Sequence, residues 1–467
     1  MCLFKEDGKL SLVHKFIQNG EYYILDVNTG AVHIVDELVY DLLDEDTLKS
    51  KEELIELFKD KYSIEEIIEV YNEIMELKEE GFLYSEDTYE EIAIKGQDSK
   101  DFIKALCLNI THDCNLRCKY CFADEGKYHG ARKIMSLEVA KKAIDFVIAH
   151  SGPRKNIEID LFGGEPLIAI KEIKEIIKYA REQEKVHNKV IRFTMTTNAT
   201  LLNDEIMEYM DKEMGNIVLS IDGRPEVNDK VRTRVDGSGT YEGILPKIKE
   251  MVDRRDKSKT YYVRGTFTHE NIDFYNDIKH LADLGFKEIS VEPVVLPDEH
   301  SLSLKEEDLP TIFENYDKLY EDMLERYENG NEFKFYHFNI DLQGGPCVYK
   351  RISGCGAGHE YIAVTPDGDI YPCHQFVGNE DFKLGTIFNE DKDINWEIAK
   401  TFKSAHIYNK PACRECWARF YCSGGCQANN YNFNGDMHIP YEIGCKMQKK
   451  RIECAIALKS KLMSEKQ

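Results

Sequence analysis

Short runs of alternating apolar and polar residues open the chain and predict a small β-sheet. The expected strands are Leu12–Ile17, Tyr22–Asp26 and Val32–Val35, separated by Gln18-Asn19-Gly20 and Asn28-Thr29-Gly30, which favour tight turns. Helical spacing follows at Glu37–Leu43, Lys51–Phe58 and Ile64–Lys78, with Gly81 as the expected C-terminal stop. Residues 1–92 are expected to form a separate unit, and the acidic stretch from Ser85 to Asp101 is expected to be a linker.

From residue 105 onward, apolar strands and amphipathic helices alternate. The expected strands are Leu106–Ile110, Ile157–Phe162, Val190–Thr196, Ile217–Ile221, Tyr261–Phe267 and Glu288–Val291. Helical patterns lie between them, for example at Leu137–Ala149, Lys171–Glu184, Ile244–Arg254 and Phe274–Leu284. Six such units predict an α/β fold with a parallel sheet, open or closed into a partial (β/α)6 barrel. Its active site is expected at the carboxyl ends of the strands.

Three further segments complete the predicted organisation. The barrel is expected to span residues 93–300. A helical bridge, 301–345, contains one long helix at Leu309–Tyr327. The remaining segment, 346–467, is poor in periodic pattern and rich in cysteine, so we expect bound metal to organise it.

Charge and hydropathy narrow the possible functions. Acidic residues outnumber basic ones by 85 to 61, a net charge of −24, which argues against a large phosphate-binding surface. No apolar run is long enough to cross a bilayer, and the first residues do not have the pattern of a signal peptide. We therefore expect a cytoplasmic protein without a membrane or nucleic-acid partner.

The 14 cysteines indicate metal binding, because the cytosol keeps thiols reduced and disulfides are rare there. Their placement is uneven: one close group lies just after the first barrel strand, and nine cysteines lie between Cys347 and Cys454. Cys2, Cys107 and Cys454 fit no motif and are most simply explained as small apolar residues or surface thiols.

The first group, Cys114, Cys118 and Cys121, forms a CxxxCxxC motif. Three thiolates on one loop can hold three irons of a cubane cluster and leave the fourth open to chelate a methionine moiety. A Cys3His zinc site completed by His112 is the simpler alternative. Context favours the cluster, because polar and glycine-rich segments follow the next three strands, namely Gly163-Gly164-Glu165-Pro166, Thr196-Thr197-Asn198 and Ser220-Ile221-Asp222-Gly223.

These motifs together resemble the radical S-adenosylmethionine (SAM) superfamily. The resemblance implies that Cys114, Cys118 and Cys121 bind the cluster that cleaves S-adenosylmethionine, with Tyr120 as the aromatic residue before the last cysteine. It also implies that residues of the strand ends contact S-adenosylmethionine; these are Gly163, Gly164, Glu165, Pro166, Asn198, Ser220 and Arg264.

The second group of cysteines has two interpretations. Four thiolates at Cys413, Cys416, Cys422 and Cys426 would suit a zinc ribbon. The full order resembles the SPASM domain, which binds two auxiliary [4Fe–4S] clusters. That pattern assigns Cys413, Cys416, Cys422 and Cys445 to one cluster and Cys355, Cys373 and Cys426 to the other. Two cubanes need eight ligands, so either Cys347 or a substrate cysteine completes the set.

The N-terminal unit resembles the PqqD-like element that captures a leader peptide as an added strand. A winged-helix DNA-binding domain has similar elements, but the acidic helices at Lys51–Phe58 and Ile64–Lys78 would repel phosphate. The whole layout resembles the maturases of six-cysteine peptides, which form thioether bridges. The implied partners are a cysteine-rich precursor peptide, with its leader bound at residues 1–92, and an electron donor such as flavodoxin or ferredoxin.

The resemblance also implies a mechanism. One electron from the first cluster cleaves S-adenosylmethionine to methionine and a 5′-deoxyadenosyl radical, and the radical takes hydrogen from a substrate carbon. A substrate cysteine sulfur bonds to that carbon, and the surplus electron leaves through an auxiliary cluster. Formylglycine formation and a carbon–carbon crosslink are the alternatives within enzymes, and a zinc-binding adaptor is the non-catalytic alternative. Sulfatase-maturing relatives carry an acidic residue where this chain has His374, which argues against formylglycine formation.

Overall fold

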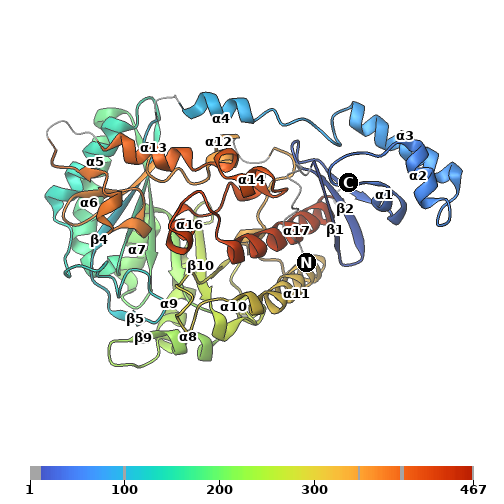
Figure 1. The fold of residues 1–467 in the computed structure, drawn as a ribbon. Helices are drawn as coiled ribbons and strands as arrows, with labels where there is room; N and C mark the ends of the chain where they lie inside the picture. Colours follow the sequence, from blue (N-terminus) through green and yellow to red (C-terminus); the bar gives the residue numbers. More distant parts are fainter. Residues whose placement is uncertain (1–11, 98–100, 345–347, 390–393, 465–467) are drawn as a thin grey trace.

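A computed structural model of the chain describes residues 12–97, 101–344, 348–389 and 394–464. In Figure 1 the N-terminal residues form a separate group of elements at one end, and the central sheet lies at the other. Between them, the C-terminal third crosses the open face of the sheet and reaches the N-terminal unit through its last helix, α17.

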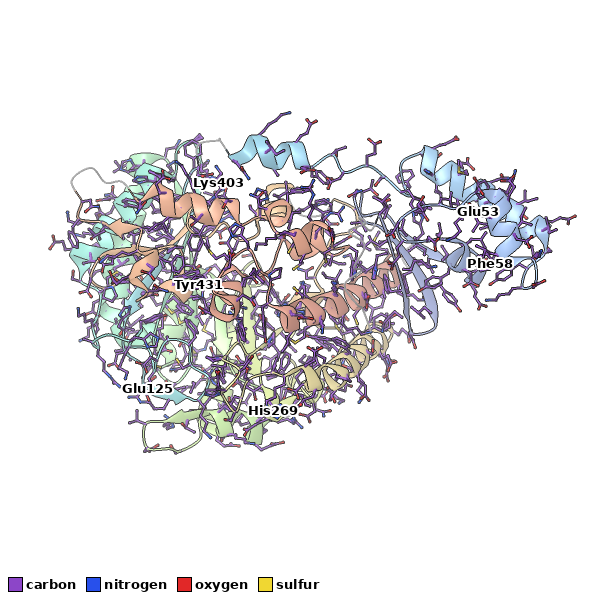
Figure 2. The ribbon with its side chains drawn as sticks, viewed as in Figure 1. Glu53, Phe58, Glu125, His269, Lys403 and Tyr431 are labelled. Carbon is purple, nitrogen blue, oxygen red and sulfur yellow. The ribbon has the colours of Figure 1, made fainter. Side chains whose placement is uncertain are left out.

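The N-terminal unit has the predicted strands and helices. β1 (Val13–Gln18), β2 (Glu21–Asp26) and β3 (Val32–Val35) form an antiparallel sheet in that order, and positive φ at Asn19 and Gly20 closes the first hairpin. α1 (Glu37–Leu42), α2 (Lys51–Phe58) and α3 (Ile64–Glu79) pack on one face, and Figure 2 shows Glu53 and Phe58 on the outer part of this unit. Capping boxes start both α2 and α3.

The predicted linker is more ordered than its composition suggested. Within the stretch from Ser85 to Asp101 that was expected to be a linker, the structure has a helix, α4 (Glu90–Gln97), which the sequence analysis did not predict. Ala93 is buried against residues of the C-terminal third, and Arg414 forms an ion pair with Glu90 at 2.8 Å. These contacts stabilise a helix whose sequence alone has a weak amphipathic pattern.

The six predicted barrel strands are all present and lie side by side in chain order, which confirms the fold class. They are β4 (Ala105–Thr111), β6 (Asn156–Gly163), β7 (Val190–Thr197), β8 (Met214–Ser220), β10 (Thr260–Phe267) and β11 (Glu288–Pro293), and every neighbouring pair is parallel. The sheet is open: β12 (Lys334–Phe335) ends one side, and β13 (Tyr361–Val364), β14 (Asp369–Tyr371) and β15 (Gly385–Thr386) extend the other. The C-terminal third therefore continues the barrel sheet.

Helices separate the parallel strands and cover the outside of the sheet (Figure 1). They are α5 (Leu137–His150), α6 (Ile170–His187), α7 (Asp204–Glu213), α8 (Pro225–Val231), α9 (Tyr241–Arg254), α10 (Tyr275–Asp283) and α11 (Leu309–Glu328). Their apolar faces join the strands in one large core. None of the helices in the described ranges combines the length and the hydropathy that a membrane span needs.

The C-terminal third contains more regular structure than expected. Besides short helices such as α12 (Val348–Ser353) and α13 (Trp396–Ser404), it ends in α17 (Glu442–Ser464), the longest helix described. Its charged residues fall on several sides because α17 contacts α11, β1 and the cysteine segments at once. No single apolar stripe marks such a helix in the sequence.

Candidate active site

The first cysteine loop is fastened at the carboxyl end of the sheet. The CxxxCxxC motif follows β4 directly, and its middle forms a short strand, β5 (Leu116–Cys118). This strand pairs antiparallel with β9 (Arg232–Arg234), while the Leu116 side chain is buried. The loop is therefore held from both sides, which keeps its cysteines in one place.

The thiols of this loop are close enough to influence one another. Burial raises the pKa of Cys114 to about 12, and Glu165, Cys118 and Cys121 act in the same direction. Burial also raises the pKa of Cys118 to about 11, against the effect of Arg232. Such thiols stay protonated at neutral pH, so a metal centre must displace their protons to hold three thiolates side by side.

Two glycines at the end of β6, Gly163 and Gly164, allow this strand end to approach the first cysteine loop closely. A Cβ atom at Gly163, where φ is +128°, would lie 2.3 Å from the Thr111 carbonyl oxygen. One at Gly164 would lie 2.0 Å from the Asp113 carbonyl oxygen. In addition, the Gly164 amide donates to Thr111 at 2.8 Å. The glycines thus let the end of β6 lie directly against the cysteine loop.

Glu165 joins two strand ends rather than facing solvent. Its buried carboxylate accepts hydrogen bonds from the Thr197 hydroxyl and the Asn198 amide, both at 2.7 Å, and from the Leu167 amide at 3.1 Å. Burial raises the pKa of Glu165, although these donors oppose the shift. Pro166 starts a buried 3-10 turn, Pro166–Ala169. Contacts of these residues with S-adenosylmethionine stay a prediction.

The remaining predicted contacts lie on the same end of the sheet. The Asn198 side-chain amide donates to Asn115 at 2.8 Å and lies 3.8 Å from the Cys114 sulfur. Ser220 and Arg264 are register partners on β8 and β10, so their side chains lie in one row across the sheet. Since Arg264 is half exposed, it remains accessible to a ligand.

A buried network beside the loop contains two residues that the sequence analysis named, Tyr120 and Asp222, and one that it missed, Arg232. The Tyr120 hydroxyl donates to Asp222 at 2.6 Å and accepts from Arg232 at 2.9 Å. All three side chains are largely enclosed, and Arg232 is the cation that acts on Cys118. Arg232 carries no signal in the sequence, because it enters the site only through the pairing of β9 with β5.

His374 lies between the first cysteine loop and the C-terminal third. Its ring centroid is 5.6 Å from that of Phe122, next to Cys121, and 5.0 Å from that of Phe162 at the end of β6. The Tyr361 hydroxyl lies 3.4 Å from its Nδ1 atom. Burial lowers the pKa of His374 to about 4, so the imidazole is neutral at pH 7.

The second cysteine group brings Cys355, Cys373 and Cys426 together. Burial raises the pKa of Cys373 well above its usual range, and Cys426 and Cys355 add to the effect. Burial also raises the pKa of Cys426, again with a contribution from Cys355. Cys355 and Cys426 are surface residues, although protein atoms surround the Cys426 thiol closely enough for burial to shift its pKa, so this group lies at the edge of the fold.

The third group, Cys413, Cys416, Cys422 and Cys445, lines one cavity of about 240 Å³. Burial raises the pKa of Cys413 and of Cys445 to about 12, with the neighbouring thiols adding to it. In the described part of the chain, no three His, Cys, Asp or Glu side chains converge tightly enough to hold a single metal ion. Four thiols around a shared volume are the donor set of a [4Fe–4S] cluster, so these residues fit that cofactor.

A second residue missed by the sequence interpretation is Lys410. Its side chain is fully buried, and its ammonium donates to the Gly424 carbonyl at 2.9 Å. The burial lowers its pKa, while Cys413 and Cys426, from two different groups, both raise it. A single lysine beside two cysteine groups carries no signal in the spacing of the cysteines.

The cysteines outside the motifs divide into two kinds. Cys107 and Cys454 are buried inside the fold, as expected for small apolar residues. Cys2 and Cys347 lie outside the described residues, so the possible role of Cys347 as an eighth ligand stays a prediction.

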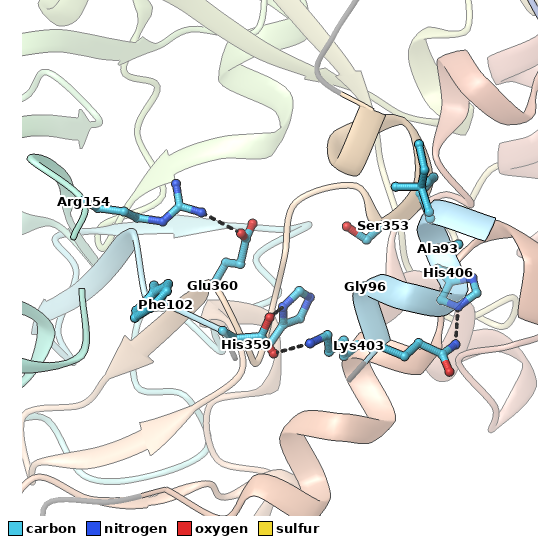
Figure 3. Close-up of a pocket in the computed structure, with 13 residues that line it drawn as sticks. Ala93, Gly96, Phe102, Arg154, Ser353, His359, Glu360, Lys403 and His406 are labelled. Atoms are coloured by element: carbon cyan, nitrogen blue, oxygen red, sulfur yellow. Dashed lines mark hydrogen bonds and ion pairs between the residues drawn. The ribbon is translucent and has the colours of Figure 1, made fainter. Parts of the chain in front are cut away.

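A separate cavity of about 180 Å³ lies where α4, the start of the barrel and the C-terminal third meet (Figure 3). Charged pairs line it, including Arg154 with Glu360 at 3.0 Å and Lys403 with Asp101 at 2.9 Å. None of the predicted site residues contributes to this cavity. It belongs to the junction of the domains.

Two family models match the chain. The model of the radical SAM superfamily matches residues 108–282, and that of the SPASM iron–sulfur cluster-binding domain matches residues 355–417. The first range contains the CxxxCxxC loop and the strand ends around it. The second contains Cys355, Cys373, Cys413 and Cys416.

Curated relatives and a solved structure extend this similarity. A cysteine-type anaerobic sulfatase-maturating enzyme of Clostridium novyi is 26% identical over 68% of this chain and 86% of its own length. The radical SAM cyclopropyl synthase TigE of Paramaledivibacter caminithermalis is 23% identical over 85% of this chain and 84% of its own. The crystal structure of Streptococcus suis SuiB bound to precursor peptide SuiA superimposes with a TM-score of 0.54 at 16% identity, over 93% of this chain and 99% of SuiB.

Proposed function

Because the chain belongs to the radical SAM superfamily and carries a SPASM domain, we propose that it installs a thioether crosslink in a cysteine-rich peptide made by the ribosome. Its relatives mature peptides or proteins, and we assign the same general activity to this chain. The proposal adds two details to this general activity: the bond that is formed is a thioether, and the substrate is a cysteine-rich peptide.

Three [4Fe–4S] clusters and S-adenosylmethionine are the proposed cofactors. When bound, they supply a 5′-deoxyadenosyl radical and an acceptor for the surplus electron. The proposed ligands are Cys114, Cys118 and Cys121 for the first cluster, Cys355, Cys373 and Cys426 for the second, and Cys413, Cys416, Cys422 and Cys445 for the third.

The chain's own residues supply binding and orientation. The strand-end row of Ser220 and Arg264, with Asn198 beside the cysteine loop, faces the position proposed for S-adenosylmethionine. The buried hydrogen bonds of Tyr120 fix the loop between Cys118 and Cys121. Rigid support of this kind keeps the reacting carbon and sulfur within reach of each other.

The N-terminal unit supports the peptide assignment. β3 forms one edge of its sheet, while α17 covers the opposite strand, β1. Ile34 on β3 is 46% exposed, and Phe82, whose carbonyl lies 3.2 Å from the His33 ring, is 48% exposed. We propose that a leader peptide adds to β3 as a further strand and covers these apolar side chains.

His374 is the observation that favours thioether formation over formylglycine formation. It occupies the position of the acidic residue expected in sulfatase-maturing relatives and faces the rings of Phe122 and Phe162. An imidazole cannot supply the negative charge of a carboxylate base at this point. Its neutral, aromatic surroundings suit a site that positions a substrate thiol and carbon.

Mass spectrometry of the product tests this proposal. The full-length protein, reconstituted anaerobically with iron and sulfide, is incubated with S-adenosylmethionine, dithionite and a cysteine-containing precursor peptide. We expect a product that lacks two hydrogen atoms and has one thiol fewer to alkylate. A product with the same mass loss but all thiols free would indicate a carbon–carbon crosslink or a formylglycine made from serine, and loss of sulfur would indicate a formylglycine made from cysteine. A colourless protein that binds zinc would contradict catalysis altogether.

A further inference from the structure

An acidic residue that has no role so far, Asp160, lies on the inner face of the central sheet. Its neighbours on β6, Ile159 and Leu161, are buried in the core that the helices cover. Since successive side chains of a strand point to opposite faces, Asp160 points away from the helices. Its register partner on β4, Cys107, belongs to a buried cluster formed with the first cysteine loop and the C-terminal third. Asp160 therefore faces these two segments.

Asp160 lies one row of side chains away from the aromatic residues at the first cysteine loop. Phe162, two residues later on β6, points to the same face and is about 6.6 Å further along the strand. Its ring centroid is 6.5 Å from that of Phe122, next to Cys121, and 5.0 Å from that of His374. A group bound against these rings would therefore lie close to the Asp160 carboxylate.

The inner face around Asp160 is polar and partly exposed. Thr194 on β7 is the register partner of Asp160 on the other side, and Thr196 lies two residues further along that strand. All three side chains keep some exposure, whereas the residues that alternate with them are buried. This face of the sheet is therefore suited to contact a polar ligand rather than to pack as core.

Asp160 forms no hydrogen bond and no ion pair with any residue that the structure describes. The acids nearer the cysteine loop are engaged: Glu165 accepts three hydrogen bonds, and Asp222 accepts one from the Tyr120 hydroxyl. A carboxyl group that is largely surrounded by protein and left unpaired costs stability. Packing alone thus gives no reason for an acid at this position.

The surroundings also make Asp160 a stronger base than an ordinary carboxylate. Burial raises the pKa of Asp160 to about 7, and the negative charge of Glu158 adds to the effect. An ordinary thiol has a pKa of about 8.5, far above that of a solvated aspartate. The raised pKa narrows this difference, so proton transfer from a thiol to Asp160 is more favourable, and part of Asp160 is still ionised at pH 7.

We propose that Asp160 is a catalytic base that accepts the proton of the substrate cysteine when its sulfur bonds to carbon. This inference rests on the proposed function. In this step the S–H bond breaks, and an S–C bond forms to the carbon that has lost a hydrogen atom to the 5′-deoxyadenosyl radical. The proton goes to a carboxylate oxygen of Asp160, and the remaining electron goes to an iron–sulfur cluster, the class of acceptor already proposed.

Asp160→Asn tests this role, because the amide keeps the size of the side chain but cannot take up the proton. The full-length, anaerobically reconstituted protein is given a precursor peptide that contains one cysteine and carries deuterium on its carbon atoms. We expect thioether formation to slow by at least about a hundredfold, the usual contribution of a general base, while deuterium still passes from the peptide to 5′-deoxyadenosine. Glu158→Gln, on the same face of β6, is the control and should keep most of the wild-type rate.

A peptide with selenocysteine in place of the cysteine separates a base from a residue that only positions the substrate. A selenol ionises at neutral pH without a base, so the Asp160→Asn variant should form the selenoether at close to the wild-type rate. Asp160→Ala is a second variant and should be restored by the same peptide. Iron content and thermal unfolding check that the variants are folded. Because an unpaired, largely buried carboxyl group costs stability, neither substitution should lower the unfolding temperature.

Three results would overturn the role of Asp160: an Asp160→Asn variant that forms the thioether at the wild-type rate, a slow variant that the selenocysteine peptide does not restore, or loss of iron and folding in both variants. Failure of the proposed function would look different. In that case the wild-type protein itself would form no thioether with the cysteine peptide.

Discussion

At the scale of single residues, the site is built mainly from side chains that hold one another in place. Glu165 accepts three hydrogen bonds, from the last residue of β7, from the residue after it and from its own turn, and Tyr120 bridges Asp222 and Arg232. A buried cation lies near each group of cysteines: Arg232 interacts electrostatically with the first group, and Lys410 with the second and third. Such buried cations stabilise the negative charge that thiolate-bound clusters carry.

Replacing Cys114, Cys118 and Cys121 with alanine should abolish reductive cleavage of S-adenosylmethionine. Since each cubane contains four irons, the iron content should fall from roughly 12 to roughly 8 atoms per chain while the other two cysteine groups keep theirs. Iron analysis and chromatography of 5′-deoxyadenosine check the two parts separately. If the triple variant still forms deoxyadenosine, the assignment of the first loop is wrong.

Lys410→Met should lower the reduction potentials of the auxiliary clusters. The buried ammonium stabilises the extra electron, and two unit charges about 6 Å apart at an effective dielectric constant of about 20 interact by roughly 3 kcal/mol, on the order of 100 mV. A redox titration followed by electron paramagnetic resonance measures the shift. Lys449→Met is the control: Lys449 lines the cavity of the third cysteine group and acts on Cys445, so its loss should leave the potential of the second cluster unchanged. Equal shifts in both variants would refute a special role for Lys410.

At the scale of elements, strand ends and their glycines decide where the first cysteine loop lies. The regular strands were predictable, because alternating and apolar runs mark β4 to β11 in the sequence. How the ends of these strands fix the position of the first cysteine loop was only partly predictable. The glycines at the end of β6 were expected near a ligand, and the structure shows that they also leave room for the backbone of Thr111 and Asp113.

Gly164→Ala should displace the first cysteine loop. The added Cβ atom would lie 2.0 Å from the Asp113 carbonyl oxygen. Because this contact is with backbone rather than with a flexible side chain, the cysteine loop would have to move away from the end of β6. We expect a folded protein with roughly 8 instead of 12 irons and no cleavage of S-adenosylmethionine. Gly215→Ala is the matched control, because its Cβ atom would lie 3.6 Å from the Phe193 carbonyl, an ordinary contact. A Gly164→Ala variant with full iron content would show that the loop tolerates the displacement.

At the scale of the whole molecule, α17 joins parts that the sequence presented as separate. It carries Cys445 of the third cysteine group in its first turn, brings Arg451 close enough to lower the pKa of Glu292, and pairs Glu453 with His14 of β1 at 2.9 Å. The His14 ring also stacks on Trp417 at 3.6 Å between centroids. The cysteine pattern and the six strands were readable from local sequence. These contacts were not, because each joins residues hundreds of positions apart and no local periodicity records it.

This packing affects how peptide binding should be tested. One face of the N-terminal sheet, including Phe16, Tyr23 and Leu25, is continuous with the main core around Trp417. Removal of residues 1–92 would therefore expose apolar surface of the C-terminal third and disturb more than the leader site. A point substitution at the free edge of the sheet separates the two effects.

Ile34→Lys should weaken binding of a leader-bearing peptide while uncoupled cleavage of S-adenosylmethionine stays unchanged. Burial of an isoleucine side chain contributes about 1.5–3 kcal/mol, so we expect an affinity loss of at least about tenfold. Fluorescence anisotropy of a labelled peptide measures the affinity. Ile17→Lys is the control, since Ile17 is similarly exposed but lies on β1, the strand that contacts α17. If both substitutions weaken binding equally, or if only Ile17→Lys does, the leader does not bind at β3. If only Ile34→Lys weakens binding, the leader binds at the edge of β3.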